Sequence, residues 1–533
     1  MSAPDFDFAI IGSGFGGSVS ALRLAEKGYS VAVLEMGKRW TKNDFPKTNW
    51  DIRKYLWRPW LGLHGMLQMT LVKDAFFLHA AGVGGGSLIY ANTLLVPPDE
   101  AFTDPRWIGQ DWKSALAPHY VTAKRMLGVV ESPIIVETDR MLKEVGDEMG
   151  RGHTWKRATV GVYFGEPGKT VVDPFFDGEG PDRTGCTMCG GCMVGCRIGA
   201  KNTLDQNYLY FAEKKGVVVQ PESRVVDIKP LAEGGYELVV EKSTAFFTKR
   251  RTMRVRGVVV SAGSYGTVEL LMRCKDSGSL SKLSPRLGTY LRTNSEAILS
   301  VRSNNPNVDY SKGIAITSGL FVDDKTHVEI VRYSDGSDAL APLATVLTGG
   351  GGWVPRWLRW FGAVLRHPIA FLRSTIPFGW AKKAAIILVM QPVDNHLTYR
   401  LRRPWYWPFT KKLDSAPGAG EPAPAYIPVA NLVAKKLAKK MNGTPQSNVF
   451  EVFLGKAATA HVLGGCPIGL TPDDGVVDPK SRAFGYDDFY VVDGSVVPAN
   501  LGVNPSLTIT AMAEHAMTHV PPRSERTTGI WAS

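Results

Sequence analysis

Four cysteines lie within one stretch of eleven residues, at a spacing that suits a metal centre. They are Cys186, Cys189, Cys192 and Cys196, in the pattern C-x2-C-x2-C-x3-C. Thiolates this close together on a glycine-rich loop can ligate an iron–sulfur cluster, and the spacing is that of bacterial ferredoxins. The pattern therefore predicts a cluster, 4Fe–4S rather than 3Fe–4S. Zinc is a competing interpretation, although its sites usually combine two separated C-x2-C knuckles, and a disulfide or free thiols are the remaining alternatives.

A second pattern, near the start of the chain, predicts a dinucleotide site. Gly12, Gly14 and Gly17 form G-x-G-x-x-G, and an acid, Glu35, ends the next apolar run. In such a turn the first glycine permits the bend, the second lets backbone approach a pyrophosphate, and the third lets helix and strand pack closely. Phe15 opens a helix whose N–H groups face the phosphates. Glu35 is expected to accept hydrogen bonds from the ribose hydroxyls, and the motif alone leaves FAD and NAD open.

Three further segments indicate which dinucleotide is bound. Residues 81–92 contain glycines that would let backbone lie against a flat ring system, between apolar flanks. Residues 490–495 read as a buried strand that ends in an acid, Asp493. Residues 502–510 start a helix that has proline, Pro505, in its first turn.

With these segments the chain resembles the glucose–methanol–choline (GMC) flavoprotein oxidoreductases. Within that family the resemblance is closest to bacterial and mycobacterial cholesterol oxidase-like enzymes, which bind FAD without a covalent bond. It spans nearly the whole chain and keeps the order of the motifs. The segments that carry it are the N-terminal fingerprint, 82–92, 201–205, Val225, 261–263, 461–466, 493–494 and 499–508.

The resemblance implies which residues bind FAD. Asp493 would lie by the phosphate and ribityl, Val225 would meet the adenine through its backbone, and the start of the helix at Pro505 would face the flavin. The full implied set is Gly12, Gly14, Phe15, Gly17, Glu35, Gly84, Gly85, Gly86, Ser87, Asn92, Val225, Ala262, Gly263, Asp493, Gly494, Asn504 and Pro505.

The resemblance also implies the chemistry. His461 and Asn504 match the active-site pair that holds the substrate hydroxyl, and flavin N5 would accept a hydride. Glu329, on an apolar run, is the match for a buried acid that moves a proton in Δ5 to Δ4 isomerisation, with an exposed edge position as the alternative. The expected reaction is oxidation of a 3β-hydroxysteroid or similar bulky alcohol to the ketone. Tyr90 departs from the asparagine of many relatives, which leaves substrate and acceptor open.

The alternative function is a flavin and iron–sulfur dehydrogenase or reductase. In that case a protein electron carrier, rather than O2, would exchange electrons with the flavin, and the substrate would be another hydrophobic ring compound. The cysteine pattern is what favours this alternative.

An α/β fold is needed to position these residues. We expect a Rossmann-like FAD-binding domain at 1–45, 80–95, 185–290 and 456–525, and an α+β substrate-binding domain with an antiparallel sheet flanked by helices at 46–79, 96–184 and 291–455. A flexible tail is expected at 526–533. Strands are predicted at 6–11, 30–35, 216–220, 224–228, 236–241 and 256–261, helices at 16–27 and 120–150, and an exposed loop at 413–425.

Composition and charge limit the other possibilities. The chain of 533 residues is 44% hydrophobic with six cysteines, which excludes a disordered chain and a disulfide scaffold. The net charge is +12, and residues 353–412 carry eleven Lys or Arg against the single acid Asp394, a net +10, with six of the fourteen Trp. This segment predicts peripheral contact with a membrane, with a surface helix or subunit interface as the alternative. The flavin fold argues against nucleic acid.

The expected location follows from what the chain lacks. The first residues show neither a basic segment nor an apolar segment of a signal peptide. No apolar run is long enough for a transmembrane helix. We therefore expect a cytoplasmic protein with peripheral membrane contact.

Overall fold

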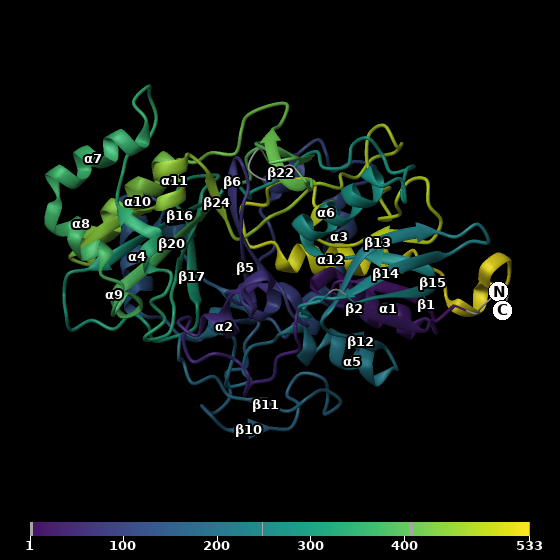
Figure 1. Cartoon of the computed structure of the whole chain (residues 1–533). Helices are drawn as coiled ribbons and strands as arrows, with labels where there is room; N and C mark the ends of the chain where they lie inside the picture. Colours follow the sequence, from purple (N-terminus) through teal and green to yellow (C-terminus); the bar gives the residue numbers. More distant parts are fainter. Residues whose placement is uncertain (1–3, 248, 405–408, 532–533) are drawn as a thin grey trace.

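A computed structural model describes residues 4–247, 249–404 and 409–531. The chain forms two lobes, each built on its own large sheet, with a small sheet between them (Figure 1). Both lobes are mixtures of helix and strand, as the α/β fold class predicts.

The first lobe is built on a sheet that is parallel at one side and antiparallel at the other. The order β12-β2-β1-β15-β14-β13 has parallel neighbours as far as β15, β25 also pairs with β15 in parallel, and the last three strands form an antiparallel meander. Its strands are β1 (Phe6–Ile11), β2 (Val31–Leu34), β12 (Val218–Gln220), β13 (Ser223–Pro230), β14 (Tyr236–Lys242), β15 (Arg250–Val260) and β25 (Phe489–Val491).

Helices cover this sheet and complete the Rossmann-like pattern. Helix α1 packs against α5 and α12, and α12 packs in turn against α3. The helices of this lobe are α1 (Phe15–Glu26), α3 (Trp112–Met126), α5 (Tyr208–Lys214), α6 (Gly263–Asp276) and α12 (Ser506–Thr518). Because β1 and β2 are parallel and buried, they read as nearly continuous apolar runs, which made them predictable.

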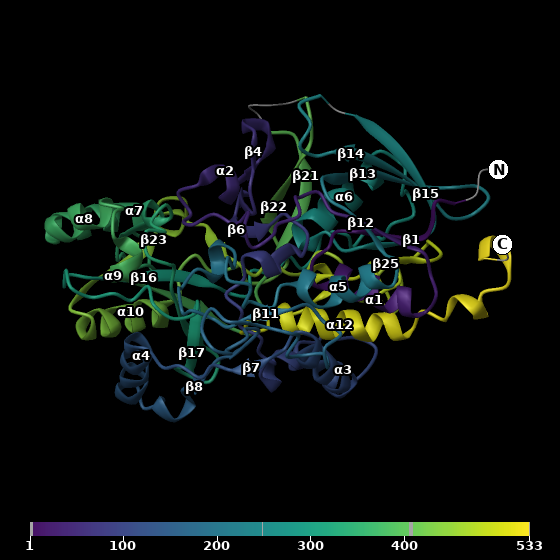
Figure 2. The same cartoon turned by 90° about the horizontal axis from the view of Figure 1, so that it is seen from below.

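The second lobe contains an antiparallel sheet of order β19-β23-β16-β20-β18-β17-β8. Its strands are β8 (Lys156–Arg157), β16 (Ala297–Ser303), β17 (Ile316–Phe321), β18 (His327–Val331), β19 (Ala344–Val346), β20 (Ala384–Met390) and β23 (Gly443–Asn448). Helices α4 (Glu137–Glu148), α7 (Arg356–Arg366), α8 (Pro368–Thr375), α9 (Trp380–Lys383), α10 (Pro428–Lys440) and α11 (Val449–Leu454) lie around it, and α7 and α8 form the end of this lobe (Figure 2).

Smaller elements connect the lobes. A three-stranded sheet of β5 (Leu67–Leu71), β6 (Ala75–Ala80) and β24 (Ala457–Thr459) leads into the glycine-rich segment after β6 and into His461 after β24. Three other short ladders pair β3 (Trp57–Arg58) with β4 (Leu63–His64), β7 (Val130–Glu131) with β9 (Thr159–Val160), and β10 (Thr170–Val171) with β11 (Arg183–Thr184). The short helix α2 (Ile52–Tyr55) precedes β3.

Two local predictions were wrong. The helix predicted at 120–150 is two helices, α3 and α4, which are separated by the short strand β7. The loop predicted at 413–425 begins with a strand, β22 (Lys412–Pro417), which pairs with β21 (Leu397–Arg402). Leu413 and Ser415 are buried there. The local composition predicts a loop because it does not reveal the partner strand, whose backbone hydrogen bonds stabilise β22.

The proposed boundaries of the two domains stay a prediction, although each lobe has its own buried apolar cluster. Of the tail predicted at 526–533, Trp531 is buried against Phe8 and Tyr29, and its ring N–H donates to Asp488 Oδ2 at 2.8 Å. Residues 532–533 lie outside the described residues.

Candidate active site

A cavity of about 740 Å³ runs between the lobes, and most of the residues predicted to bind FAD line it. The predicted residues that line it are Gly12, Gly14, Phe15, Glu35, Gly85, Gly86, Val225, Ala262, Gly263, His461, Asp493, Gly494, Asn504 and Pro505. Gly17, Gly84, Ser87, Asn92 and Glu329 are not among its lining residues, although Glu329 contacts one of them, Asn504.

The turn between β1 and α1 has the geometry that the glycine pattern predicts. Gly12 has φ of +99°, and a Cβ there would stand 2.3 Å from the Ser261 carbonyl oxygen. A Cβ on Gly17 would stand 2.0 Å from the Gly12 carbonyl oxygen, so this glycine allows α1 to pack on β1. A Cβ on Gly14 would meet no atom within 4 Å. The backbone at Gly14 therefore faces open space in the cavity.

Glu35, at the end of β2, is a buried carboxylate that ties three segments together. It accepts hydrogen bonds from the backbone and hydroxyl of Ser13 at 3.1 and 2.7 Å, from Gly37 N at 2.8 Å and from Gly82 N at 3.2 Å. Burial raises the pKa of Glu35, and these four donors oppose that effect. The expected contact with ribose stays a prediction, but Glu35 already fixes the glycine-rich segment after β6 against the turn.

The glycine-rich segment lies directly on the first turn. Gly85 has φ of +51°, and a Cβ on it would be 2.6 Å from Gly14 Cα, so only hydrogen fits between these two backbones. Ser87 Oγ donates to the Gly84 carbonyl oxygen at 2.6 Å and accepts from Leu204 N at 3.1 Å. Ser87 therefore shapes the loop.

Asp493 follows β25 and organises the opposite wall. Its carboxylate accepts from Gly263 N at 2.9 Å, from Thr267 Oγ1 at 2.5 Å, and from the backbone and hydroxyl of Ser495 at 2.8 and 2.6 Å. Burial raises the pKa of Asp493, and the four donors lower it. Asp493 thereby joins the start of α6 to the segment that leads to Asn504.

Asn504 stands just before α12 and contacts a carboxyl group from the other lobe. Its Nδ2 donates to Glu329 Oε2 at 3.1 Å, and Glu329 is fully buried on β18. Burial raises the pKa of Glu329 to about 7, although the Asn504 hydrogen bond and His461 act in the opposite direction. Among the described residues, neither Glu329 Oε1 nor Asn504 Oδ1 has a hydrogen-bond partner. A carboxyl group with this pKa can both take and return a proton near neutral pH.

His461 is paired with an acid that the sequence analysis missed. Its Nδ1 contacts Glu296 Oε1, and Glu296 Oε2 accepts from Ala460 N at 2.8 Å. Burial lowers the pKa of His461, but the carboxylates of Glu296 and Glu329 outweigh it, and the pKa is raised. Glu296 belongs to no motif, and its only signal is an acid directly before the apolar strand β16.

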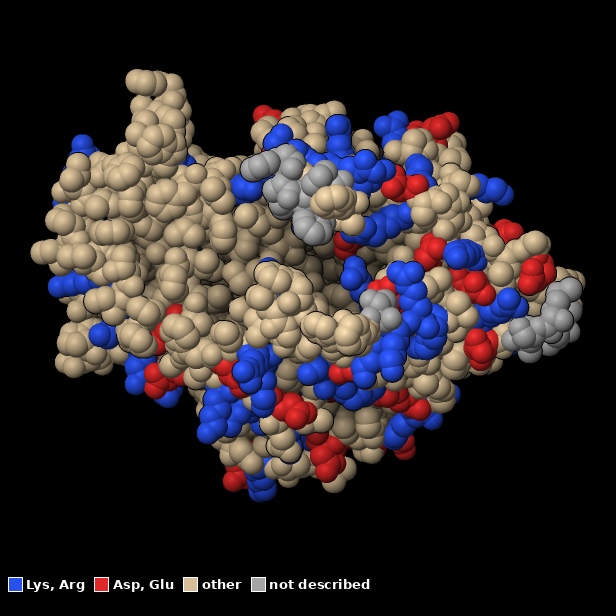
Figure 3. Space-filling view, in the orientation of Figure 1, with Lys and Arg blue, Asp and Glu red and all other residues tan. Residues whose placement is uncertain are grey.

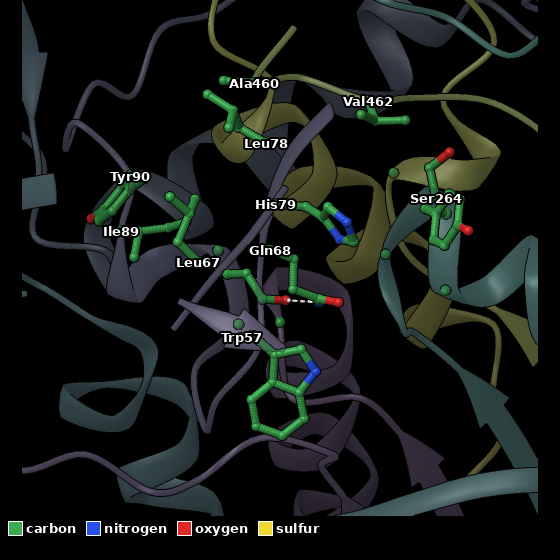
Figure 4. A pocket seen from close by; sticks show the side chains of 18 of the residues that line it. Trp57, Leu67, Gln68, Leu78, His79, Ile89, Tyr90, Ser264, Ala460 and Val462 are labelled. Carbon is green, nitrogen blue, oxygen red and sulfur yellow. Dashed lines mark hydrogen bonds between the residues drawn. The ribbon is translucent and has the colours of Figure 1, made fainter. Parts of the chain in front are cut away.

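The remainder of the cavity is apolar on one side. Figure 4 shows Leu67, Ile89 and Tyr90 grouped on one side of the cavity and Ser264 on the other. Tyr90 donates its hydroxyl to the Asn202 carbonyl oxygen at 2.8 Å, so its ring forms a fixed part of the wall. Further apolar lining residues are Tyr55, Trp57, Leu78, Leu299, Tyr333, Leu340, Leu343, Trp380, Ile386 and Leu388. This region suits a hydrophobic molecule with few polar groups.

The cysteine segment does not assemble the predicted metal site. Cys186 and Cys192 are buried, Cys189 is exposed, and all four thiols are free. Within 4–247, 249–404 and 409–531, no group of three or more His, Cys, Asp or Glu side chains is arranged to hold a metal ion. The structure therefore does not support the iron–sulfur prediction. The spacing of the cysteines along the chain limits how close their thiols can come, but the conformation of the loop decides where each thiol points.

The residues that line the cavity fit FAD. The open space at Gly14, the contact of Gly85 with Gly14, and the buried carboxylates Glu35 and Asp493 come from separate parts of the chain and meet at one cavity. Beyond them stand His461 and Asn504, where a hydroxyl group could be held between a base and an amide.

Comparisons with known proteins agree with this geometry. A family model described as GMC oxidoreductase matches residues 429–513, and one described as an NAD(P)-binding Rossmann-like domain matches residues 10–41. A cholesterol oxidase from Acinetobacter baumannii is 50% identical, over 97% of this chain and 95% of its own length. A cholesterol oxidase from Mycobacterium tuberculosis (strain CDC 1551 / Oshkosh) is 46% identical, over 98% of this chain and 92% of its own.

The overall fold also has a solved relative. Pyridoxine 4-oxidase from Mesorbium loti aligns over 96% of this chain and 99% of its own, with a TM-score of 0.59 and 15% identity. At that identity the likeness concerns the fold alone.

Proposed function

The chain belongs to the GMC oxidoreductase family of FAD-dependent alcohol oxidoreductases, and we propose that it oxidises the secondary 3β-hydroxyl of a steroid to a ketone. The observation that carries the proposal is that His461 and Asn504 line one cavity, beside an apolar region large enough for a ring system. The two relatives at 50% and 46% identity, both named cholesterol oxidase, support a steroid as the substrate.

In the proposed reaction, three residues of this chain hold the hydroxyl or move a proton. Asn504 orients the hydroxyl, and the imidazole of His461 takes its proton. FAD, when bound, accepts the hydride from the carbinol carbon. Glu329, with its pKa of about 7, would then move a proton from C4 to C6 of a Δ5-ketone, which isomerises the double bond.

The test is turnover of a 3β-hydroxy-Δ5-steroid by the FAD-loaded protein, with the ketone separated by chromatography. His461→Ala and Asn504→Ala should each lower kcat on the order of 100-fold or more, since the first removes the proton acceptor and the second removes the group that orients the hydroxyl. His153→Ala, at an exposed histidine, is the matched control and should keep full turnover. Full turnover by both active-site variants would remove the mechanism.

The electron acceptor separates two versions of this function. Oxidation by O2 needs no further redox group, whereas the carrier version uses the iron–sulfur cluster predicted from the four cysteines. Anaerobic reduction with substrate followed by mixing with air distinguishes them: reoxidation as fast as turnover supports O2, and slower reoxidation supports a protein carrier.

We also propose that the face of α7 and α8 contacts a membrane. No residue of α7 is buried, and the space-filling view shows few charged side chains on this lobe (Figure 3). Trp353 is 93% exposed and Leu365 is 82% exposed. The other exposed apolar side chains are Trp357, Leu358, Phe361, Ile369, Leu372, Ile376 and Phe378. Trp405 and Trp407 of the predicted segment lie outside the described residues.

Two residues of the basic, Trp-rich segment do not belong to the exposed face of α7 and α8. Trp360 is turned toward the lobe, where its ring N–H donates to Thr345 Oγ1 at 2.8 Å. Arg356 is also turned inward, with Nη1 at 3.8 Å from Glu451 Oε2. Helix α8 contacts the segment around Leu343, which lines the cavity, so a sterol leaving a bilayer at this face would have a short path inward. No helix of the described residues has the length and hydropathy to cross a bilayer.

Vesicle sedimentation tests the contact, with phosphatidylcholine vesicles that contain or lack phosphatidylserine. The double variant Leu365→Asp/Leu372→Asp should bind at least about tenfold more weakly. Burial of each exposed leucine side chain in the bilayer would contribute roughly 1.5–3 kcal/mol to the binding free energy. Val121→Asp, at an exposed residue of α3, is the control. Equal binding by wild type and the double variant would exclude this face, and a requirement for phosphatidylserine would assign the binding to the basic residues.

A further inference from the structure

The segment 292–296, which leads into β16, is buried along its whole length although every residue in it is polar. Each of its five residues is at most 1% exposed. Asn294 and Ser295 have φ of +55° and +44°, in the left-handed region that non-glycine residues seldom adopt. Surrounding contacts must hold such a backbone, and those contacts lead to the active site.

One set of contacts holds the loop of His461. Arg292 and Leu463 exchange backbone hydrogen bonds of 2.8 and 3.1 Å, just after the histidine. Glu296 accepts from Ala460 N at 2.8 Å, just before it, and contacts the imidazole at Nδ1. Residues 292–296 therefore hydrogen-bond to the His461 loop before and after the histidine, and they contact the imidazole ring as well.

A second set of contacts holds the loop of Asn504. Asn294 Oδ1 accepts from Leu501 N and Gly502 N, both at 2.9 Å, and Asn294 Nδ2 donates to the Val503 carbonyl oxygen at 3.0 Å. One side chain therefore satisfies three consecutive residues directly before Asn504.

The segment is itself anchored at its start. The fully buried guanidinium of Arg292 donates to Asp394 Oδ1 at 2.8 Å and to the carbonyl oxygens of Asn395 at 3.0 Å and Pro498 at 3.2 Å. The His461 loop and the Asn504 loop are both hydrogen-bonded to residues 292–296. The conformation of this segment therefore sets the distance between His461 and Asn504.

We propose that residues 292–296 are the positioning segment of the active site, and that Glu296 holds His461 with the proton on Nδ1, so that Nε2 accepts the substrate proton. The inference rests on the proposed function for the identity of that proton. Asn294 performs the corresponding task for Asn504, by fixing the turn from which the amide projects.

The chemistry balances with these groups. A carboxylate can only accept from an imidazole, so Glu296 directs Nδ1 to carry a hydrogen and leaves the lone pair on Nε2. The hydroxyl proton moves to Nε2, the carbinol hydride leaves to the cofactor, and the C–O bond becomes the ketone. Glu296 balances the charge of the imidazolium that forms. Glu296 and Glu329 are the charged groups that act on His461, and both raise its pKa.

The test is Glu296→Gln, which keeps the size of the side chain and removes its charge. In the FAD-loaded variant we expect the His461 ring, followed by NMR of labelled histidine, to titrate at lower pH than in wild type. The rising limb of kcat against pH should move to lower pH with it, and the plateau should fall on the order of 100-fold. Asp139→Asn, which neutralises a buried carboxylate on α4 near neither loop, is the control and should shift neither curve.

The outcomes separate this inference from the proposed function. Identical His461 titration in wild type and Glu296→Gln overturns the inference, whatever the activity. A shifted titration in a protein that does not oxidise steroids overturns the proposed function and leaves the role of Glu296 toward the ring in place. If Glu296→Gln does not fold, Glu296→Asp carries the test: its carboxylate is withdrawn by one methylene, so His461 should again titrate lower, and an unchanged titration overturns the inference.

Discussion

Replacing Glu329 with Gln should separate oxidation from isomerisation and also change how stability depends on pH. Glu329 is fully buried on β18, and its carboxylate receives a single hydrogen bond, from Asn504, among the described residues. The variant keeps the size of the side chain and removes the titrating proton.

The size of the pH effect follows from the pKa. The folded-state pKa of Glu329 is about 7, against an ordinary value of 4.5. Between these pH values the unfolded chain has released a proton that the folded protein still holds, so stability falls as pH rises through this window. The difference corresponds to about 3 kcal/mol above pH 7, and it is absent below the unfolded-state pKa.

The assay is urea unfolding of the FAD-loaded proteins at pH 5 and at pH 8. Relative to wild type, Glu329→Gln should gain up to about 3 kcal/mol on going from the lower to the higher pH. Glu451→Gln is a matched control: burial raises the pKa of Glu451 to about 8, so that variant should also gain stability with pH, over a window that extends higher, while isomerisation continues.

The catalytic half of the same experiment uses the product distribution. Wild type should release the conjugated ketone at a rate that rises with pH through about 7, because the ionised carboxylate is the proton acceptor. Glu329→Gln should release the unconjugated Δ5-ketone, with isomerisation lowered on the order of 100-fold or more. If the stability of both proteins depended on pH in the same way, the raised pKa of the buried Glu329 carboxyl would be refuted. Undiminished isomerisation by the variant would refute the proton-shuttle role.

The remaining predictions concern the cofactor cavity. Gly85→Ala should lower bound FAD, measured from flavin absorbance after gel filtration, since its Cβ would stand 2.6 Å from Gly14 Cα; Gly168→Ala, also at positive φ but with no atom nearer than 3.9 Å, is the control and should retain FAD. Full FAD content in Gly85→Ala would show that the two backbones can separate. Asp493→Asn should destabilise the protein by roughly 1–3 kcal/mol in urea unfolding, because an amide N–H2 would face donors from Gly263, Thr267 and Ser495. An unchanged urea midpoint would mean that these donors find other partners.

Local sequence was sufficient for the first strand, glycine turn and helix of the first lobe and for its antiparallel meander. The strand, glycine turn and helix at the start of the chain are contiguous, and their buried apolar runs and glycine spacing are read within about 30 residues. The strands of the meander were predicted for the same reason, since their alternating patterns are local. The predictions that failed concerned short strands that only their pairing reveals: β22, which was predicted as a loop, pairs with β21, and β7, inside the predicted helix, pairs with β9.

The cysteine segment and Glu296 show what local sequence could not predict, namely contacts made in the folded structure. Spacing placed four thiols within reach of one another, but the loop that carries them is held by tertiary contacts: buried Lys201 donates to the carbonyl oxygens of Leu88 and Cys192 at 2.8 and 2.7 Å. Nothing near Glu296 in the sequence indicates His461, which lies 165 residues away.

The sequence by itself determined the chemical inventory of this protein: a glycine turn for a pyrophosphate, a histidine and an asparagine in matching motifs, and a basic, Trp-rich segment. The tertiary structure decided which of these groups meet. It brought Glu329 to Asn504 and Glu296 to His461, and it turned Trp360 inward. The physical reason is that hydrogen bonds and burial act over a few ångströms in space, whereas sequence patterns report only neighbours along the chain.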